Sequence, residues 1–146
     1  MQAISFSSVA IVALGGSLGA SSRYLMGVLF QQYVPGYPWA TLVVNSMGCF
    51  CAGLLLGMAL FRLPPHPTFM LFGMTGFLGS FTTFSAFGYE VHQLWWQNRP
   101  TEALLHIFAN MIGSLLSVGL GLLCLWGLGP KIVVRFSQPG PQQPML

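Results

Sequence analysis

Apolar residues dominate four long stretches of the chain, and short polar segments separate them. The four stretches run over residues 4–30, 39–61, 68–96 and 102–128. The segments between them read QQYVPGYP, RLPPHP and QNRPT, and their prolines mark turns. About 20 predominantly apolar residues cross a bilayer as an α-helix. The pattern predicts an all-α integral membrane domain over residues 1–129 with four transmembrane helices, and an extramembrane, disordered tail over residues 130–146.

The third stretch contains a segment that interrupts its own helical pattern. Residues 73–88, GMTGFLGSFTTFSAFG, hold four glycines, five hydroxyl residues and four phenylalanines without a charge. Gly76, Gly79 and the pair Thr82–Thr83 favour a departure from the helix. Within a bilayer, unwound backbone is tolerated where protein or a polar cavity satisfies it. Such breaks offer carbonyls to cations and helix N-termini to anions, so the sequence predicts a third helix broken at mid-membrane.

Two phenylalanines follow the predicted break. Phe84 and Phe87 are three residues apart and share one face of the second half-helix. The edge of an aromatic ring is electropositive, so two edges along a narrow path can contact an anion without trapping it. The alternative is that both rings face lipid or fill the core.

Small residues form a stripe along the first stretch. Gly15, Gly19, Arg23 and Gly27 recur at every fourth position. Small residues at this spacing allow close helix packing, which predicts a helix–helix seam. A cation inside a span normally faces protein, water or a partner. We therefore predict an architectural role for Arg23, such as attracting anions to a vestibule.

Polar residues also line up along the second and fourth stretches. In the second stretch, Thr41 and Asn45 lie one helical turn apart and can form a polar track or hold helices together. The fourth stretch carries a longer stripe at intervals of four and then three residues: Glu102, His106, Asn110, Ser114 and Ser117. One such residue often joins two helices, whereas four or five in line indicate a polar groove.

Composition supports the membrane assignment. Only 5% of the residues are charged and the mean hydropathy is +0.71, whereas soluble domains carry about 25% charged residues. The net charge of +3 is too small and too scattered to indicate nucleic acid binding. The three cysteines lie in apolar stretches and suggest neither a disulfide framework nor a zinc site. The N-terminus lacks the basic region and cleavage site of a secretory signal.

Basic residues divide almost evenly between the two sides of the predicted topology. Arg62, Lys131 and Arg135 fall on one side, and Arg99, joined by Arg23 if that residue lies near a surface, falls on the other. This weak bias predicts that the chain inserts in both orientations, which permits an antiparallel homodimer. One four-helix chain is also too small to surround a pore, so we expect it to oligomerise.

Four motifs in order along the chain resemble the CrcB family, the Fluc fluoride channels. They are GGSLGASSRY at 15–24, ATLVVNSMG at 40–48, GFLGSFTTFSAF at 76–87 and NMIGS at 110–114. The resemblance implies a passive fluoride channel of the bacterial cell (inner or plasma) membrane that relieves fluoride toxicity. It also implies an antiparallel homodimer with two pores and a central structural sodium ion, held by the backbone carbonyls of Gly79 and Thr82 from both subunits.

The resemblance also assigns roles to side chains. The residues that it places along the fluoride path are Asn45, Phe84, Ser85, Phe87, Asn110 and Ser114, and Arg23 matches the family's arginine in the first span. Thr41, on the face of Asn45, joins this set through the polar track described above. The chain departs from the family pattern at Val118, a polar position in the family, at Ala86, a threonine position, and at Asn110, where some relatives carry Tyr or His.

Two other functions remain open from the residues. A small antiparallel drug/proton exchanger needs a carboxylate at depth, and the only acids are Glu90, beyond the predicted break, and Glu102, at the start of the fourth span. A non-transporting assembly protein would use every polar stripe to join helices. Neither the three histidines nor any other residues form a catalytic constellation, so we do not expect an enzyme.

Overall fold

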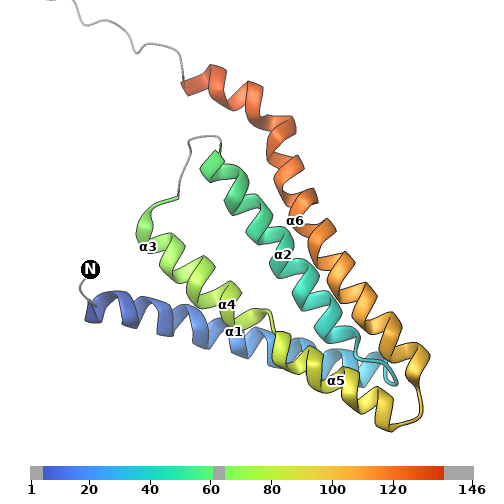
Figure 1. Cartoon of the computed structure of the whole chain (residues 1–146). Helices are drawn as coiled ribbons and strands as arrows, with labels where there is room; N and C mark the ends of the chain where they lie inside the picture. The colour runs from blue at the N-terminus through green and yellow to red at the C-terminus, as the bar shows by residue number, and fades with distance from the viewer. Residues whose placement is uncertain (1–4, 61–64, 137–146) are drawn as a thin grey trace, which may run out of the picture.

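The computed structural model describes residues 5–60 and 65–136, and this part of the chain is helical apart from its turns. In chain order the elements are α1 (Phe6–Tyr33), α2 (Trp39–Leu60), α3 (Pro67–Met70), the π-helix η1 (Leu71–Leu78), α4 (Gly79–Phe81), α5 (Phe84–Trp96) and α6 (Pro100–Phe136). Four helical stretches are long and apolar enough to span a membrane, the third of them comprising α3 to α5 (Figure 1). The prediction of an all-α protein with four spans is confirmed.

The last helix is longer than the sequence pattern indicates. We expected the fourth span to end near residue 128, yet α6 continues to Phe136, into the segment expected to form a tail. Residues 137–146, the rest of that tail, lie outside the described residues, as does Arg62.

The first half of the third span packs along α1 (Figure 1). Gly15 and Gly19 are the buried residues of α1, and each faces main-chain atoms. A Cβ at Gly15 would overlap the carbonyl oxygen of Phe72, and a Cβ at Gly19 that of Phe77. The two backbones approach this closely only because both positions lack a side chain. The predicted glycine seam is therefore present at these two positions.

A second glycine seam joins α2 and α6, which run side by side in Figure 1. A Cβ at Gly53 of α2 would overlap the carbonyl oxygen of Val118, and a Cβ at Gly121 of α6 would overlap that of Phe50. Each helix therefore carries a glycine, with no side chain, where it contacts the backbone of the other. This contact fixes α6 against α2 and so sets which face of α6 points into the bundle.

The third span is interrupted at the position that the sequence predicts. Its first half widens into the π-helix η1 and then narrows into α4, so Gly76 and Gly79 both remain helical. The chain leaves the helix at Thr82 (φ −77°, ψ 158°) and Thr83 (φ −154°, ψ 126°), both extended. The helix then restarts as α5. Of the residues expected to break the helix, the threonine pair does so.

Candidate functional site

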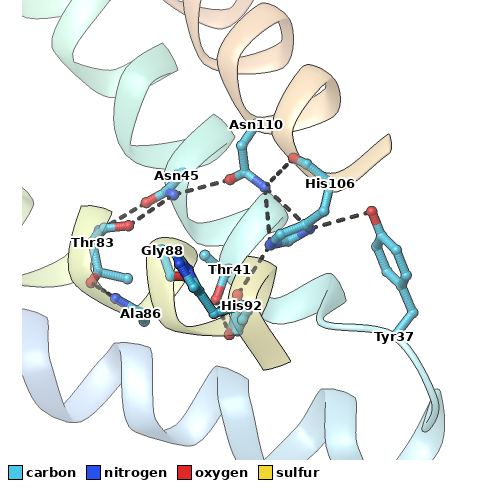
Figure 2. A network of polar contacts seen from close by, with 10 residues as sticks. Tyr37, Thr41, Asn45, Thr83, Ala86, Gly88, His92, His106 and Asn110 are labelled. Atoms are coloured by element: carbon cyan, nitrogen blue, oxygen red, sulfur yellow. Dashed lines mark hydrogen bonds and ion pairs between the residues drawn. The ribbon is translucent and has the colours of Figure 1, made fainter. Parts of the chain in front are cut away.

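The side chain of Asn45 satisfies the main chain at the break. Its Oδ1 accepts a hydrogen bond from the Thr83 N–H (2.8 Å), and its Nδ2 donates to the Thr83 carbonyl (3.1 Å; Figure 2). A break leaves backbone groups without helical partners, which is costly away from water. The amide of Asn45 replaces two of those partners, so α2 holds the break in place.

The helix after the break has a side-chain cap at its N-terminus. Thr83 is the N-cap of α5, and its Oγ1 accepts a hydrogen bond from the Ala86 N–H at 3.1 Å. The hydroxyl of Ser85 lies 3.2 Å from the same oxygen. The N-terminus of a helix carries a partial positive charge. The break therefore places a positive helix end and two hydroxyl groups within the third span.

A chain of amides leads from the break to α6. Asn45 Nδ2 also donates to Asn110 Oδ1 at 3.1 Å, and Asn110 Nδ2 donates to the carbonyl of His106 at 3.1 Å (Figure 2). His106 and Asn110 are 0% and 1% exposed, which makes them among the most deeply buried side chains described. Uncharged hydrogen-bonding groups thus occupy the centre of the helix bundle.

His106 lies at the middle of a second set of contacts. Its Nε2 donates to the carboxylate oxygen Oε2 of Glu90 at 3.1 Å, and Thr41 Oγ1 donates to the other oxygen of that carboxylate at 2.7 Å. The hydroxyl of Tyr37 lies 3.3 Å from His106 Nδ1 and can donate to it (Figure 2). Because a buried polar group without a partner is costly, this set of contacts keeps the imidazole in one orientation.

The two phenylalanines of the predicted path lie side by side but differ in burial. The rings of Phe84 and Phe87 have their centroids 5.3 Å apart. Phe87 is 7% exposed and its ring lies 5.5 Å from that of His106, whereas Phe84 is 73% exposed. The prediction that they share a face of α5 is confirmed. The ring of Phe87 packs against the polar network at His106, and the ring of Phe84 lies on the surface of the single chain.

A cleft of about 630 Å³ opens beside the network. The ends of α1 and α5, the start of α2 and the loop between α1 and α2 line it, and its walls include Gln31, Tyr37, Glu90, Gln93 and Arg99. Tyr37 and Glu90 belong both to the cleft and to the contacts of His106. The cleft therefore borders the contacts of His106.

Arg99 joins the loop between α5 and α6 to the loop between α1 and α2. Its Nη2 donates to the carbonyl of Gly36 at 2.6 Å, and its guanidinium pairs with Glu102 one turn into α6. Gly36 has φ +99°, which a residue with a side chain rarely adopts. Burial, followed by the nearby charges of Glu102 and Glu90, raises the pKa of Tyr37. Tyr37 thus stays a neutral hydrogen-bond donor to the imidazole.

Not every predicted residue joins this network. Ser114 is partly buried on α6, and no hydrogen bond of its hydroxyl appears within the described part of the chain. Arg23 is also partly buried, but Tyr24, Gly27 and Val28 line the cleft from α1, not Arg23. The proposed roles of Ser114 and Arg23 therefore stay predictions.

Three residues of the network were not among the sequence-predicted site residues: Tyr37, Glu90 and His106. We expected Glu90 to lie towards a loop, yet its carboxylate contacts α2 and α6. A signal was available, because Glu90 follows Phe87 by three residues and so shares its face of α5. His106 belonged to the polar stripe of the fourth span. Tyr37 carried no signal, since its loop is positioned only by the fold.

These features define a class: a multi-pass membrane protein whose third helix is interrupted and whose centre is lined by hydrogen-bonding groups. Within residues 5–60 and 65–136, no three His, Cys, Asp or Glu side chains cluster as ligands of a metal. The chain belongs to the family described as CrcB-like protein, Camphor Resistance (CrcB), which it matches over residues 10–122.

Curated relatives cover most of the chain. A protein of Prosthecochloris aestuarii is 37% identical over 119 residues, which are 80% of this chain and 91% of the relative. One of Legionella pneumophila (strain Paris) is 42% identical over 113 residues, 77% of this chain and 84% of the relative. Both carry the name "Fluoride-specific ion channel FluC". Together with the four apolar helices, these bacterial relatives identify a multi-pass membrane protein of a channel family and not an enzyme.

Proposed function

We propose that this chain is the subunit of a passive, fluoride-selective channel through which fluoride leaves the bacterial cytoplasm. The observation that carries the proposal is the interrupted third span, where uncharged donors lie inside an apolar bundle next to the paired rings of Phe84 and Phe87. The relatives named above carry the name of a fluoride channel. Fluoride that enters as neutral HF ionises in the cytoplasm and then leaves down its gradient, which relieves its toxicity.

The chemistry of the break suits a small, strongly hydrated anion. Such an ion gives up its water only where other donors replace it, and it must bind weakly enough to leave. Amide, hydroxyl and aromatic C–H groups of Asn45, Ser85, Phe84 and Phe87 can supply weak, neutral contacts of this kind. Lysine and arginine do not take part in the hydrogen-bond network around Asn45 and His106. A buried cation there would hold fluoride too tightly to conduct it.

The single chain does not enclose a path by itself, which favours a homodimer. Phe84 is 73% exposed directly after the break, where its ring borders the network only through Phe87. A second copy laid across the break would cover Phe84 and provide the opposite wall. Because the described spans carry few charges and the basic residues divide almost evenly, the two copies can insert in opposite orientations. Two such walls give two pores in an antiparallel dimer.

A sodium ion fits the carbonyl groups at the break. In a continuous helix, the N–H of Thr83 would donate to the carbonyl of Gly79, and the N–H of Ala86 to that of Thr82. Here the Thr83 N–H donates to Asn45, and the Ala86 N–H donates to the Thr83 hydroxyl. Both carbonyls thus lose their usual donor, and oxygen ligands of this kind suit a hard cation. We propose that Gly79 and Thr82 of two copies hold a structural sodium ion at the dimer centre.

An ion-flux experiment tests the proposal. Purified protein in liposomes that contain a little sodium and are loaded with potassium fluoride or potassium chloride is given a potassium conductance, so that potassium leaves with the anion and balances its charge. Electrodes selective for fluoride and for chloride follow efflux. We expect rapid fluoride efflux with little chloride efflux, and loss of fluoride efflux in a Phe84→Ile/Phe87→Ile variant. A Phe69→Ile variant is the control, because Phe69 is exposed on the short helix α3, away from the network. Equal fluoride and chloride efflux would contradict selectivity.

The position of Glu90 favours one rival function to a limited degree. A drug/proton exchanger needs a carboxylate inside the bundle, and Glu90 supplies one. Its two oxygens, however, accept hydrogen bonds from Thr41 and His106. Exchange would require a proton gradient, whereas a passive channel needs only a fluoride gradient. Proton-driven drug uptake that Glu90→Gln abolishes, without fluoride efflux, would support the exchanger.

A further inference from the structure

Both amide hydrogens of Asn45 are already committed inside the single chain. One is donated to the carbonyl of Thr83 and the other to Asn110 Oδ1, each at 3.1 Å (Figure 2). The first belongs to a two-point contact with the backbone of the break and cannot be released without opening it. Only the hydrogen that points at Asn110 can therefore be given to an anion.

The orientation of the Asn110 amide follows from the same contacts. Because the backbone of Thr83 determines which end of Asn45 is the donor, the atom of Asn110 that faces Asn45 must be the carbonyl oxygen. The nitrogen of Asn110 then points the other way and donates to the carbonyl of His106. In this arrangement Asn110 presents an acceptor, not a donor, to the route of an anion.

We propose that Asn110 Oδ1 occupies the position that an anion takes at Asn45. Fluoride binds by displacing this oxygen, while the side-chain amide of Asn110 rotates by a half-turn. A half-turn of this amide places its N–H groups beside the freed N–H of Asn45, so that two donors converge on one anion. The half-turn brings Asn110 Oδ1 to the place of Nδ2, which now lies 3.3 and 3.4 Å from the two ring nitrogens of His106. The His106 carbonyl that loses its side-chain partner keeps the main-chain N–H of Asn110, because both residues lie within α6. The proposal rests on the function proposed above and names Asn110 as the residue that controls access to Asn45.

The geometry also explains why such a site would prefer a small anion. Asn45 Nδ2 and Asn110 Oδ1 are 3.1 Å apart in direct hydrogen-bond contact, so an anion that enters between the two amides finds little room. The side chains cannot easily spread, since Asn110 is 1% exposed and Asn45 is fixed to the break. A larger halide would have to force the two amides apart in a closely packed interior.

Side-chain amide signals of the full-length protein in lipid nanodiscs test the proposal. Sodium fluoride is titrated into ¹⁵N-labelled wild type, Asn110→Ser and Asn110→Asp, with sodium chloride as the reference salt. Ser17→Ala is the matched control, because the Ser17 hydroxyl bonds only to Leu14 of its own helix on an exposed face. Fluoride efflux is measured on the same preparations.

In wild type, we expect saturable shifts of both the Asn45 and Asn110 amides with fluoride and none with chloride. Serine at position 110 is too short to reach Asn45, so it removes both the competing acceptor and the second donor, and the fluoride half-saturation concentration should stay within about threefold of wild type. Aspartate keeps an acceptor against Asn45 in either orientation and has no N–H. Asn110→Asp should therefore raise the half-saturation concentration by about tenfold or more.

The outcomes separate this proposal from the channel function. Shifts of both amides in wild type support the proposal even if efflux is absent, in which case the channel function fails. Rapid efflux without an amide shift supports the channel and overturns the proposal. Equal weakening by Asn110→Ser and Asn110→Asp also overturns it, because Asn110 would then act only as a donor and its oxygen would not compete with the anion. The wild-type titration tests whether fluoride binds between Asn45 and Asn110 even if a variant does not fold.

Discussion

Replacing Asn45 by leucine should destabilise the break far more than an ordinary polar substitution in a membrane helix. Leucine has as many side-chain heavy atoms as asparagine and branches at the same atom, but it cannot donate to the Thr83 carbonyl or accept from the Thr83 N–H. Thr83 is 9% exposed, so little water reaches its two backbone groups. Both groups lose their partner without gaining another.

The magnitude follows from the number of groups left unpaired. A buried polar group that loses its partner costs about 1–3 kcal/mol, so the two backbone groups of Thr83 and Asn110 Oδ1, which loses its donor as well, together cost about 3–9 kcal/mol. Thr41→Val is the matched control, since it removes one side-chain hydrogen bond, to Glu90, and leaves every backbone group paired. Interhelical side-chain hydrogen bonds in membranes average about 0.6 kcal/mol, with a maximum of about 1.7 kcal/mol.

Unfolding in mixed micelles with increasing dodecyl sulfate, followed by tryptophan fluorescence, measures both variants. We expect the Asn45→Leu variant to lose several times as much free energy of unfolding as Thr41→Val. Hydrogen exchange gives a local readout, because the Thr83 N–H should lose protection in the leucine variant alone. An Asn45→Leu protein as stable as Thr41→Val, with Thr83 still protected, would refute the reasoning.

Three further predictions concern other parts of the molecule. Gly19→Ala should lower the free energy of unfolding by about 1–3 kcal/mol, since its Cβ meets the Phe77 carbonyl. Gly27→Ala is the control, because a Cβ at Gly27 meets nothing within 4 Å and should leave the free energy of unfolding unchanged. Thermal unfolding compares the two variants. The raised pKa of Tyr37 contributes stability that is fully present below about pH 10 and falls as pH rises towards the folded pKa, because the unfolded chain ionises first. Melting temperatures between about pH 8 and about pH 11 should therefore decline less steeply in Tyr37→Phe. Fluoride efflux should be independent of a proton gradient both in wild type and in Glu90→Gln. Efflux that depends on the proton gradient in wild type, but not in Glu90→Gln, would contradict a passive channel.

The long-range pattern of this fold is largely predictable from the sequence. Hydropathy marks the four spans because a bilayer demands about 20 apolar residues from each. The break is predictable because the segment around Thr82 and Thr83 is rich in glycine and hydroxyl residues within a span. The glycine stripe of α1 predicts its seam, which the structure places against the backbone of η1.

The partners of the polar side chains are much less predictable. Whether Asn45 contacts the break or the fourth span depends on how α2 is rotated, and it contacts both. Glu90 reaches His106 from α5, which restarts after the extended pair of threonines. Tyr37 joins them from a loop held by Arg99. Such contacts arise from the assembled bundle, so spacing along the chain does not specify them.

The most direct test of the central claim is the current that purified protein carries across a planar bilayer with a fluoride gradient and equal chloride on both sides. A passive fluoride channel predicts a current that reverses near the fluoride equilibrium potential and does not change when a pH gradient is added. A current that reverses at the chloride potential, or one that follows the pH gradient, would contradict the account.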